Sequence, residues 1–494
     1  MSQAKRSKKR RTGKADSSNA SSRVPNKEQL VGLLEWFLAD AGIFSKVKLH
    51  GNTSWLPKNL VWLALCWAWS ESKNLTDAFT EAVGCCQVLS KSSALSTYQG
   101  FMGALTRWTS EFIYLLCLLL QQRMEEIGGK FWRIGGWVPI AFDGSRSTVP
   151  RTKANEKAFC AANYGFGQTA RHRKKKTKGM RRKKNEKNPP HPQEPQAWIT
   201  LMWHMALRLP WMWRLGPSNS SERGHVIEML HAGKFPLNTL FCGDAGFVGY
   251  PLWAEILDRG GQFLIRVGAN VSLLAESADF RLLRKGLVLC WPKAMATAGR
   301  PPLYLRLVKV RIGRLQVCLL TSVLEPAKLP VKQIIQFYKM RWGIEIEFRG
   351  LKQTLERAKL RSRNDQRLFV ELDWSIMGMA VAELFALKEQ LTEKTPAAVR
   401  HRPPPEPTKR SLAKTIRALR NCMRNLHDIP EPDRDLRRLL AAAVTDNYSR
   451  QTSKRARYRP NNPDKNKSLG EPQLRKLTPQ EKTKLRAIDQ NLAA

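Results

Sequence analysis

The segment from Tyr338 to Lys352 constrains the fold of this chain more than any other. It reads YKMRWGIEIEFRGLK, so Tyr338, Arg341, Glu345 and Lys352 follow one another at steps of three, four and seven residues. On an α-helix, at about 100° per residue, these four side chains fall within an arc of about 60°. An apolar stripe beside them consists of Phe337, Ile344, Phe348, Leu351 and Leu355. The pattern predicts one helix that packs into a core and presents a hydroxyl, a guanidinium, a carboxylate and an ammonium group along one line.

The simplest interpretation of this segment is an amphipathic helix with a solvated charged face, in which Glu345 pairs with Arg349 one turn on. At a typical usage of about 5% per residue type, however, four fixed positions match by chance in well under about 1% of chains of this length. The pattern Y-x2-R-x3-E-x6-K resembles the signature of bacterial insertion-sequence transposases of the DDE type, in the insertion-sequence-four family. This resemblance implies two further carboxylates upstream.

Two aspartates fit that expectation. The apolar run 138–142 leads into Asp143, and the run 237–242 leads through Gly243 into Asp244, so each aspartate closes a predicted buried strand. A single strand-end Asp is most often a turn former or a helix cap. Here Asp244 follows Asp143 by 101 residues, and Glu345 follows Asp244 by 101 residues. Both gaps leave room for folded structure. In the family, the three carboxylates come in this order on a ribonuclease-H-like fold, the first on strand one and the second just after strand four.

The elements between the two aspartates agree with such a core. Residues 197–205 and 207–215 are strand-like, residues 220–230 read as a helix, and the strand 237–242 follows. The order strand, strand, strand, helix, strand is that of a ribonuclease-H-like core. The predicted fold class is therefore α/β, with a ribonuclease-H-like catalytic core, a β-rich insertion domain and an N-terminal helical domain.

The predicted domain boundaries follow composition and pattern. We expect a basic disordered tail at 1–25 and a helical domain at 26–125, which in the family recognises the ends of the element but could equally be a structural bundle. The catalytic core takes 130–261, with a basic loop at 166–196, and 329–392, and the β-rich insertion takes 262–328. A Pro-rich linker and a basic C-terminal tail, polar and expected to be disordered after Asp446, occupy 393–494.

Two features of the predicted insertion bear on DNA contacts. Arg266 ends a strand in the context FLIRV, similar to the family's, where it would bind phosphate, although a salt-bridged strand end is an equal alternative. In some family members a Trp before a Leu-Leu-Thr strand end stacks on a flipped DNA base, but here Val317 and Cys318 precede Leu319. Trp291 could substitute for it or could be a core residue.

The charge balance indicates a polyanionic partner. The chain has 84 Lys and Arg against 41 Asp and Glu, a formal net charge of +43, and nucleic acid is the likeliest class of partner for such a surplus. The densest basic run has no apolar period, which predicts a disordered loop that lies along DNA without choosing sequence, or else a solubilising charge run. Its basic residues include Arg171, Arg173, Lys174, Lys175, Lys176, Arg181, Arg182, Lys183 and Lys184.

Other residue classes narrow the type of protein. The nine Cys are scattered without a C-x-x-C pair, which favours reduced thiols of a cytoplasmic protein. The family resemblance implies that this protein is bacterial and nucleoid-associated. The eight His show no zinc-ligand spacing. The apolar runs 60–69 and 112–120 are far shorter than the roughly 20 residues of a membrane span, so no membrane partner is expected.

The resemblance implies a chemistry for these residues. Asp143, Asp244 and Glu345 would hold two Mg²⁺ (or Mn²⁺) ions about 3.5–4 Å apart for in-line phosphoryl transfer. Arg341, Lys352 and Tyr338 would bind phosphates of the cleaved strand. The implied protein is a cut-and-paste transposase of a mobile element, acting as a homodimer on the terminal inverted repeats and on target DNA. A structure-selective nuclease of the same fold and an inactive basic DNA-binding protein remain as alternatives.

Overall fold

The computed structural model describes residues 24–39, 41–47, 55–90, 97–159, 195–313, 315–392, 406–445 and 469–493. Nearly all of the predicted N-terminal tail and the basic residues from Arg171 to Lys184 lie outside the described residues. The predicted disorder of both segments, and the predicted DNA contact of the basic run, therefore stay predictions.

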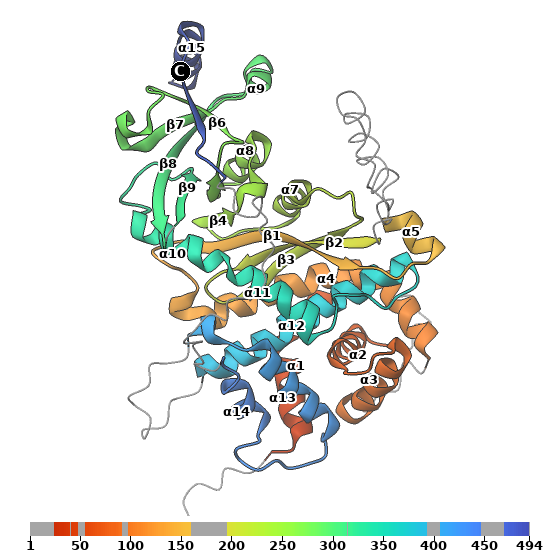
Figure 1. The fold of residues 1–494 in the computed structure, drawn as a ribbon. Coiled ribbons are helices and arrows are strands. Elements are labelled where there is room, and N and C mark those ends of the chain that lie inside the picture. The colour runs from red at the N-terminus through yellow and green to blue at the C-terminus, as the bar shows by residue number, and fades with distance from the viewer. Residues whose placement is uncertain are drawn as a thin grey trace, which may run out of the picture.

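A single mixed sheet runs through the molecule, in the strand order β10-β6-β7-β8-β9-β5-β4-β1-β2-β3 (Figure 1). The strands are β1 (Val138–Thr148), β2 (Gln196–His204), β3 (Leu209–Gly216), β4 (Thr239–Gly243), β5 (Gln262–Val267), β6 (Ser272–Ala275), β7 (Leu287–Cys290), β8 (Leu303–Ile312), β9 (Leu315–Thr321) and β10 (Gln473–Lys476). β1 pairs antiparallel with β2 and β2 with β3, whereas β1, β4 and β5 are parallel. The prediction of a mixed α/β protein is confirmed.

The strands predicted between the two aspartates coincide with β2, β3 and β4 to within about two residues. Arg208, with φ of 54°, lies in the turn between β2 and β3. Pro210 lies inside β3, where it pairs with Trp203 next to a register shift. β3 is an edge strand of the sheet. A proline, which has no backbone N–H to donate, is tolerated in such a strand.

Helices cover both faces of this half of the sheet (Figure 1). α7 (Glu222–Ala232) packs against β1, β2 and β3, and α8 (Tyr250–Asp258) packs against β5. On the other face lie α4 (Tyr98–Gly128), α10 (Val331–Arg341), α11 (Gly343–Arg349) and α12 (Asp365–Thr392). The short helix α5 (Lys153–Phe159) follows β1 and contacts α12.

The prediction of one continuous helix from Tyr338 to Lys352 is wrong. α10 ends at Arg341, α11 begins at Gly343, and a π-helical turn (Gly350–Thr354) carries Lys352. A Cβ atom on Gly343 would come within 2.2 Å of the Trp203 ring, so the backbone at this joint lies directly on β2. The wider π turn then moves Lys352 off the line that a regular α-helix would give it.

The N-terminal helices and the helices between residues 412 and 441 form one helical body with α4 and α12. It contains α1 (Asn26–Phe37), α2 (Pro57–Trp69), α3 (Leu75–Ser90), α13 (Leu412–Arg424) and α14 (Leu436–Ala441), with a 3₁₀ turn (Ala41–Lys46) after α1. Trp374 on α12 donates from Nε1 to Thr109 Oγ1 at 2.8 Å, and Trp69 donates to the Gly378 carbonyl at 2.7 Å. Helices far apart in sequence thus share one buried core.

Strands β6 to β9 continue the core sheet beyond β5, because β9 pairs antiparallel with β5. A short helix, α9 (Lys293–Thr297), follows β7. Trp291 is 6% exposed and donates from Nε1 to the Arg300 carbonyl at 2.8 Å, so it is a core residue of this extension.

The C-terminal segment was expected to be disordered after Asp446, which is wrong for residues 469–493. They form β10, which pairs in parallel with the edge strand β6, and α15 (Pro479–Ala493). Leu485 and Ile488 of α15 pack beside Trp291. The C-terminal end therefore lies far from α13 and α14 (Figure 1).

Within the described ranges, one helix, α4, is long and apolar enough to cross a membrane by length and composition alone. It packs along α12 in the helical body, and a buried core helix of this length meets the same criterion.

Candidate functional site

Asp143 and Asp244 lie at the same level of two neighbouring parallel strands. The pairing of β1 with β4 ends at Ala141 and Cys242, and each aspartate comes two residues after that last β1–β4 pair. Adjacent strands are about 4.8 Å apart. Asp244 follows the end of β4, as predicted, but β1 continues to Thr148 paired with β2, so the prediction that Asp143 closes its strand is wrong. The two aspartates are therefore neighbours at the point where β1 and β4 separate.

Backbone amides hold both carboxylates. Asp143 Oδ1 accepts from the Gly144 N–H at 2.9 Å, and Asp244 Oδ1 accepts from the Gly246 N–H at 2.7 Å, where Asp244 caps the 3₁₀ turn Ala245–Phe247. The pKa of Asp143 is raised to about 6, mainly by burial and also by the charges of Asp244 and Glu345, against the lowering effects of the Gly144 N–H and Arg341. The neighbouring acids thus oppose the ionisation of Asp143.

Glu345 lies in the first turn of α11, and its side chain is exposed. Its charge reaches Asp143, but it has the weakest of the named effects on that pKa. Among the described residues, no three Asp, Glu, His or Cys side chains converge closely enough to hold a metal ion. The three predicted carboxylates thus lie in one region, near the point where β1 and β4 separate, without forming a closed ligand set.

Arg341, at the end of α10, lies beside Asp143. Its side chain is buried, and Nη1 is 3.8 Å from Asp143 Oδ2. Within the described part of the chain, its buried Nε and Nη1 have no hydrogen-bond partner. Tyr338 is 7% exposed, with the Arg341 guanidinium 5.9 Å from its ring centre. Because a buried guanidinium without acceptors is costly, Arg341 can bind a further anionic oxygen here.

Lys352 reaches β1 from the π-helical turn. Its Nζ donates to Ser145 Oγ at 2.7 Å, two residues beyond Asp143, and burial lowers its pKa. The ammonium group therefore lies on the carboxylate edge despite the changed helix geometry.

Arg266, by contrast, lies one strand further out. It is half-buried on β5, pairs with Leu319 of β9, and acts electrostatically on Cys318. The structure describes no contact between Arg266 and the carboxylates, so its role in phosphate binding stays a prediction.

A fourth carboxylate, Glu222, lies at the same edge and was not predicted as a site residue. It is the first residue of α7, directly after the cap Ser221. The pKa of Glu222 is raised to about 7, mainly by burial and also by the charges of Asp143 and Asp244, against the lowering effect of Arg146. In the sequence, its only signal was an acidic residue in a helix's first turn, which is common for helix stability alone.

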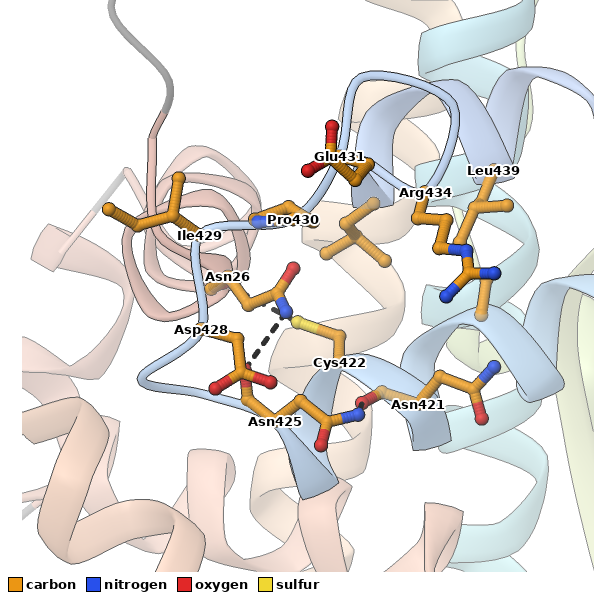
Figure 2. A pocket seen from close by; sticks show the side chains of 12 residues that line it. Asn26, Asn421, Cys422, Asn425, Asp428, Ile429, Pro430, Glu431, Arg434 and Leu439 are labelled. Atoms are coloured by element: carbon orange, nitrogen blue, oxygen red, sulfur yellow. Dashed lines mark hydrogen bonds between the residues drawn. The ribbon is translucent and has the colours of Figure 1, made fainter.

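A pocket among the described residues lies elsewhere, in the helical body (Figure 2). It has a volume of about 710 Å³, and none of the four carboxylates lines it. Asn26 at the start of α1 donates to the Asn425 carbonyl at 2.9 Å and accepts from Cys422 Sγ at 3.4 Å. These bonds join α1 to α13. The pocket therefore lies where the N-terminal helix α1 meets the later helix α13.

Comparisons with known proteins concern the part that holds the carboxylates. Residues 139–378 match the family model described as "Transposase DDE domain". The chain is 25% identical, over 158 residues, to a protein of Sinorhizobium fredii (strain NBRC 101917 / NGR234) named "Putative transposase y4zB". That match covers 30% of this chain and 43% of the relative, so it spans less than half of the relative's length.

Among solved structures, the chain is similar to a piggyBac transposase synaptic complex with hairpin DNA, at 14% identity and a TM-score of 0.35 over 86% of this chain and 84% of that one. The family match encloses Asp143, Asp244 and Glu345 together with Tyr338, Arg341 and Lys352. Residues 139–378 are thus similar to the DDE domain of transposases.

Proposed function

We propose that this chain is a DNA transposase that cleaves and joins DNA at the ends of its own element by metal-dependent phosphoryl transfer. The observation that carries the proposal is the placement of Asp143 and Asp244 two residues beyond the last pair of β1 with β4, with Arg341 buried beside Asp143. The family match over residues 139–378 and the relative named as a transposase support it.

The chemistry of the donor set fits a hard divalent cation. Asp143, Asp244 and Glu345 offer carboxylate oxygens, the ligands that Mg²⁺ and Mn²⁺ prefer, with no thiol or imidazole among them. When bound, such ions polarise the phosphodiester and lower the pKa of the attacking water or 3′-hydroxyl. We also propose that the site binds two ions, that the core is ribonuclease-H-like and that the chain belongs to the insertion-sequence-four family.

The basic residues of the site have separate tasks in the proposal. Arg341 favours the ionised form of Asp143 and offers Nε and Nη1, which have no hydrogen-bond partner among the described residues, to a phosphate oxygen. Lys352 exchanges its bond to Ser145 for a second phosphate contact. Tyr338 holds the Arg341 guanidinium against its ring and reaches DNA only if that packing opens.

The partner in this proposal is double-stranded DNA, both the terminal inverted repeats and the target. The net charge of +43 supports a polyanionic partner, and the basic run at 171–187 would add contacts without sequence choice. Synapsis of two ends favours a homodimer, and a cytoplasmic, nucleoid-associated location follows from the partner.

The test is a strand-transfer assay with the full-length chain, a plasmid that carries the DNA flanking both sides of its gene, and a target plasmid. In Mg²⁺ we expect excised ends and insertions. Asp143→Asn, Asp244→Asn and Glu345→Gln should each lower both products by at least about 100-fold, because even loss of an outer-shell partner of a metal ligand costs 10–100-fold.

DNA binding by these variants, measured by gel shift, should stay within about twofold of wild type. Cleavage without insertions would indicate a nuclease instead. Unchanged products in any one variant would remove that residue from the proposed site.

A further inference from the structure

Glu222 lies between the residues that follow Asp143 and those that follow Asp244. A Cβ atom on Gly144 would come within 2.2 Å of Glu222 Oε1, so this carboxylate lies directly on the backbone that follows Asp143. A Cβ atom on Gly246 would be 3.7 Å from Glu222 Oε2 and 3.0 Å from Asp244 Oδ1. One oxygen of Glu222 thus faces the Asp143 side and the other faces the Asp244 side.

The start of α7 fixes this position. Ser221 caps the helix by accepting from the Gly224 N–H at 3.2 Å, and α7 packs across β1, β2 and β3. α7, which carries Glu222, therefore lies on the opposite face of the sheet to α11, which carries Glu345. Glycine at position 144 is needed for this approach, since any side chain there would collide with the carboxylate.

The surroundings of Glu222 do not neutralise it. Among the described residues, the Glu222 carboxylate has no hydrogen bond or ion pair, and Arg146, whose charge lowers its pKa, stacks on the Trp198 ring at 3.9 Å. A carboxylate that only stabilised a helix would extend toward solvent or toward free backbone N–H groups. Instead, the Glu222 carboxylate lies against the backbone at Gly144 and near Gly246, and the charges of Asp143 and Asp244 both act on it.

We propose that Glu222 is a fourth carboxylate ligand of the divalent-metal centre formed with Asp143 and Asp244. This inference rests on the proposed function. The centre would then draw ligands from both faces of the sheet, with Glu222 from α7 on one and Glu345 from α11 on the other. A bound cation would relieve the mutual repulsion of Glu222, Asp143 and Asp244.

The test measures Mn²⁺ binding to the full-length, DNA-free chain by the electron paramagnetic resonance signal of free Mn²⁺. Glu222→Gln keeps the size of the side chain and removes its charge. Glu228→Gln is the matched control, because Glu228 lies on the same helix and pairs only with Arg214 at the surface, at 3.8 Å. We expect Glu222→Gln to weaken Mn²⁺ binding at least tenfold and Glu228→Gln to leave it within about twofold of wild type.

A second readout guards against misfolding. Without metal, Glu222→Gln should melt at or above the wild-type temperature, because one of three mutually repelling charges is gone, and its gain in Tm on adding Mn²⁺ should be smaller than that of wild type. If Glu222 only stabilised the helix, Glu222→Gln would melt lower without metal and bind Mn²⁺ as wild type does.

The reference variant Asp143→Asn separates this inference from the proposed function. Loss of Mn²⁺ binding in Asp143→Asn with normal binding in Glu222→Gln would overturn the role of Glu222 and leave the proposed function standing. Normal binding in both variants would contradict the metal centre itself.

Discussion

Two groups of buried charge, one in the helical body and one at the end of β1 and β4, are built in opposite ways. Glu371 of α12 is fully buried and accepts from the Arg361 and Ser362 backbone N–H groups and from Arg361 Nε, at 2.9–3.3 Å. Arg357, itself 4% exposed, lies 3.7 Å from it. At the strand ends, acids outnumber bases, and Arg341 retains unpaired donors.

The difference separates a structural site from a functional one. Around Glu371, donors and acceptors are matched, so removal of any member leaves a buried charge without a partner. At the strand ends the acids repel one another, so removal of one should cost little stability and much activity. Stability and activity should therefore respond in opposite order to substitutions in the two groups.

The largest loss of stability is expected from Glu371→Ala. It leaves Arg357 and Arg361 without their carboxylate, and breaking a buried pair in this way costs roughly 3–5 kcal/mol. Urea unfolding followed by circular dichroism measures the free energy of unfolding. Glu125→Ala, an exposed position on α4, is the control and should lie within about 0.5 kcal/mol of wild type. A loss below about 1 kcal/mol in Glu371→Ala would remove the distinction between the two groups.

The next effect depends on pH. Burial raises the pKa of Asp373 from 3.8 to about 7, although Trp213 Nε1 donates to its Oδ1 at 2.8 Å. The folded state therefore binds this proton more tightly than the unfolded state does, and the free energy of unfolding contributed by Asp373 falls as pH rises from about 4 to 7.

Asp373→Asn keeps an acceptor for Trp213 and cannot ionise. At pH 8 it should be more stable than wild type by roughly 2–4 kcal/mol, from about 1.4 kcal/mol per pKa unit, and at pH 4 the two should agree. Paired urea titrations at the two pH values measure this. Equal stability at pH 8 would show that Asp373 is ionised at no cost.

The smallest effect concerns Lys352. Lys352→Ala removes the contact to Ser145 and, in the proposed function, a charge-assisted phosphate contact worth roughly 1.5–3 kcal/mol. Cleavage should fall about 10- to 100-fold with a change in Tm of a few degrees or less. Lys339→Ala, exposed on α10, should cleave as wild type does. Equal rates in the two variants would place Lys352 outside the DNA contact.

Local pattern was enough to predict that apolar strands lead into Asp143 and Asp244, because an apolar run is a signal within a few residues. The turn predicted at Gly144 was wrong, because β1 continues to Thr148 by pairing with β2, a strand about 50 residues later. The break between α10 and α11 was not predictable, because it depends on Gly343 lying against Trp203, about 140 residues earlier. Glu222 was missed for the same reason, since only the packing of α7 on the sheet brings it to the strand ends. β10 and α15 were missed because their apolar partners, such as Trp291, lie in the strand extension.

The most direct test of the central claim is to locate bound metal. Crystals of the DNA-free chain soaked in Mn²⁺ should show an anomalous difference peak between β1 and β4, within about 2.0–2.6 Å of carboxylate oxygens of both Asp143 and Asp244. Asp244→Asn crystals soaked in the same way should lose that peak. A wild-type crystal with Mn²⁺ bound only elsewhere, or with no peak at the strand ends, would contradict the assignment of these carboxylates as a metal centre.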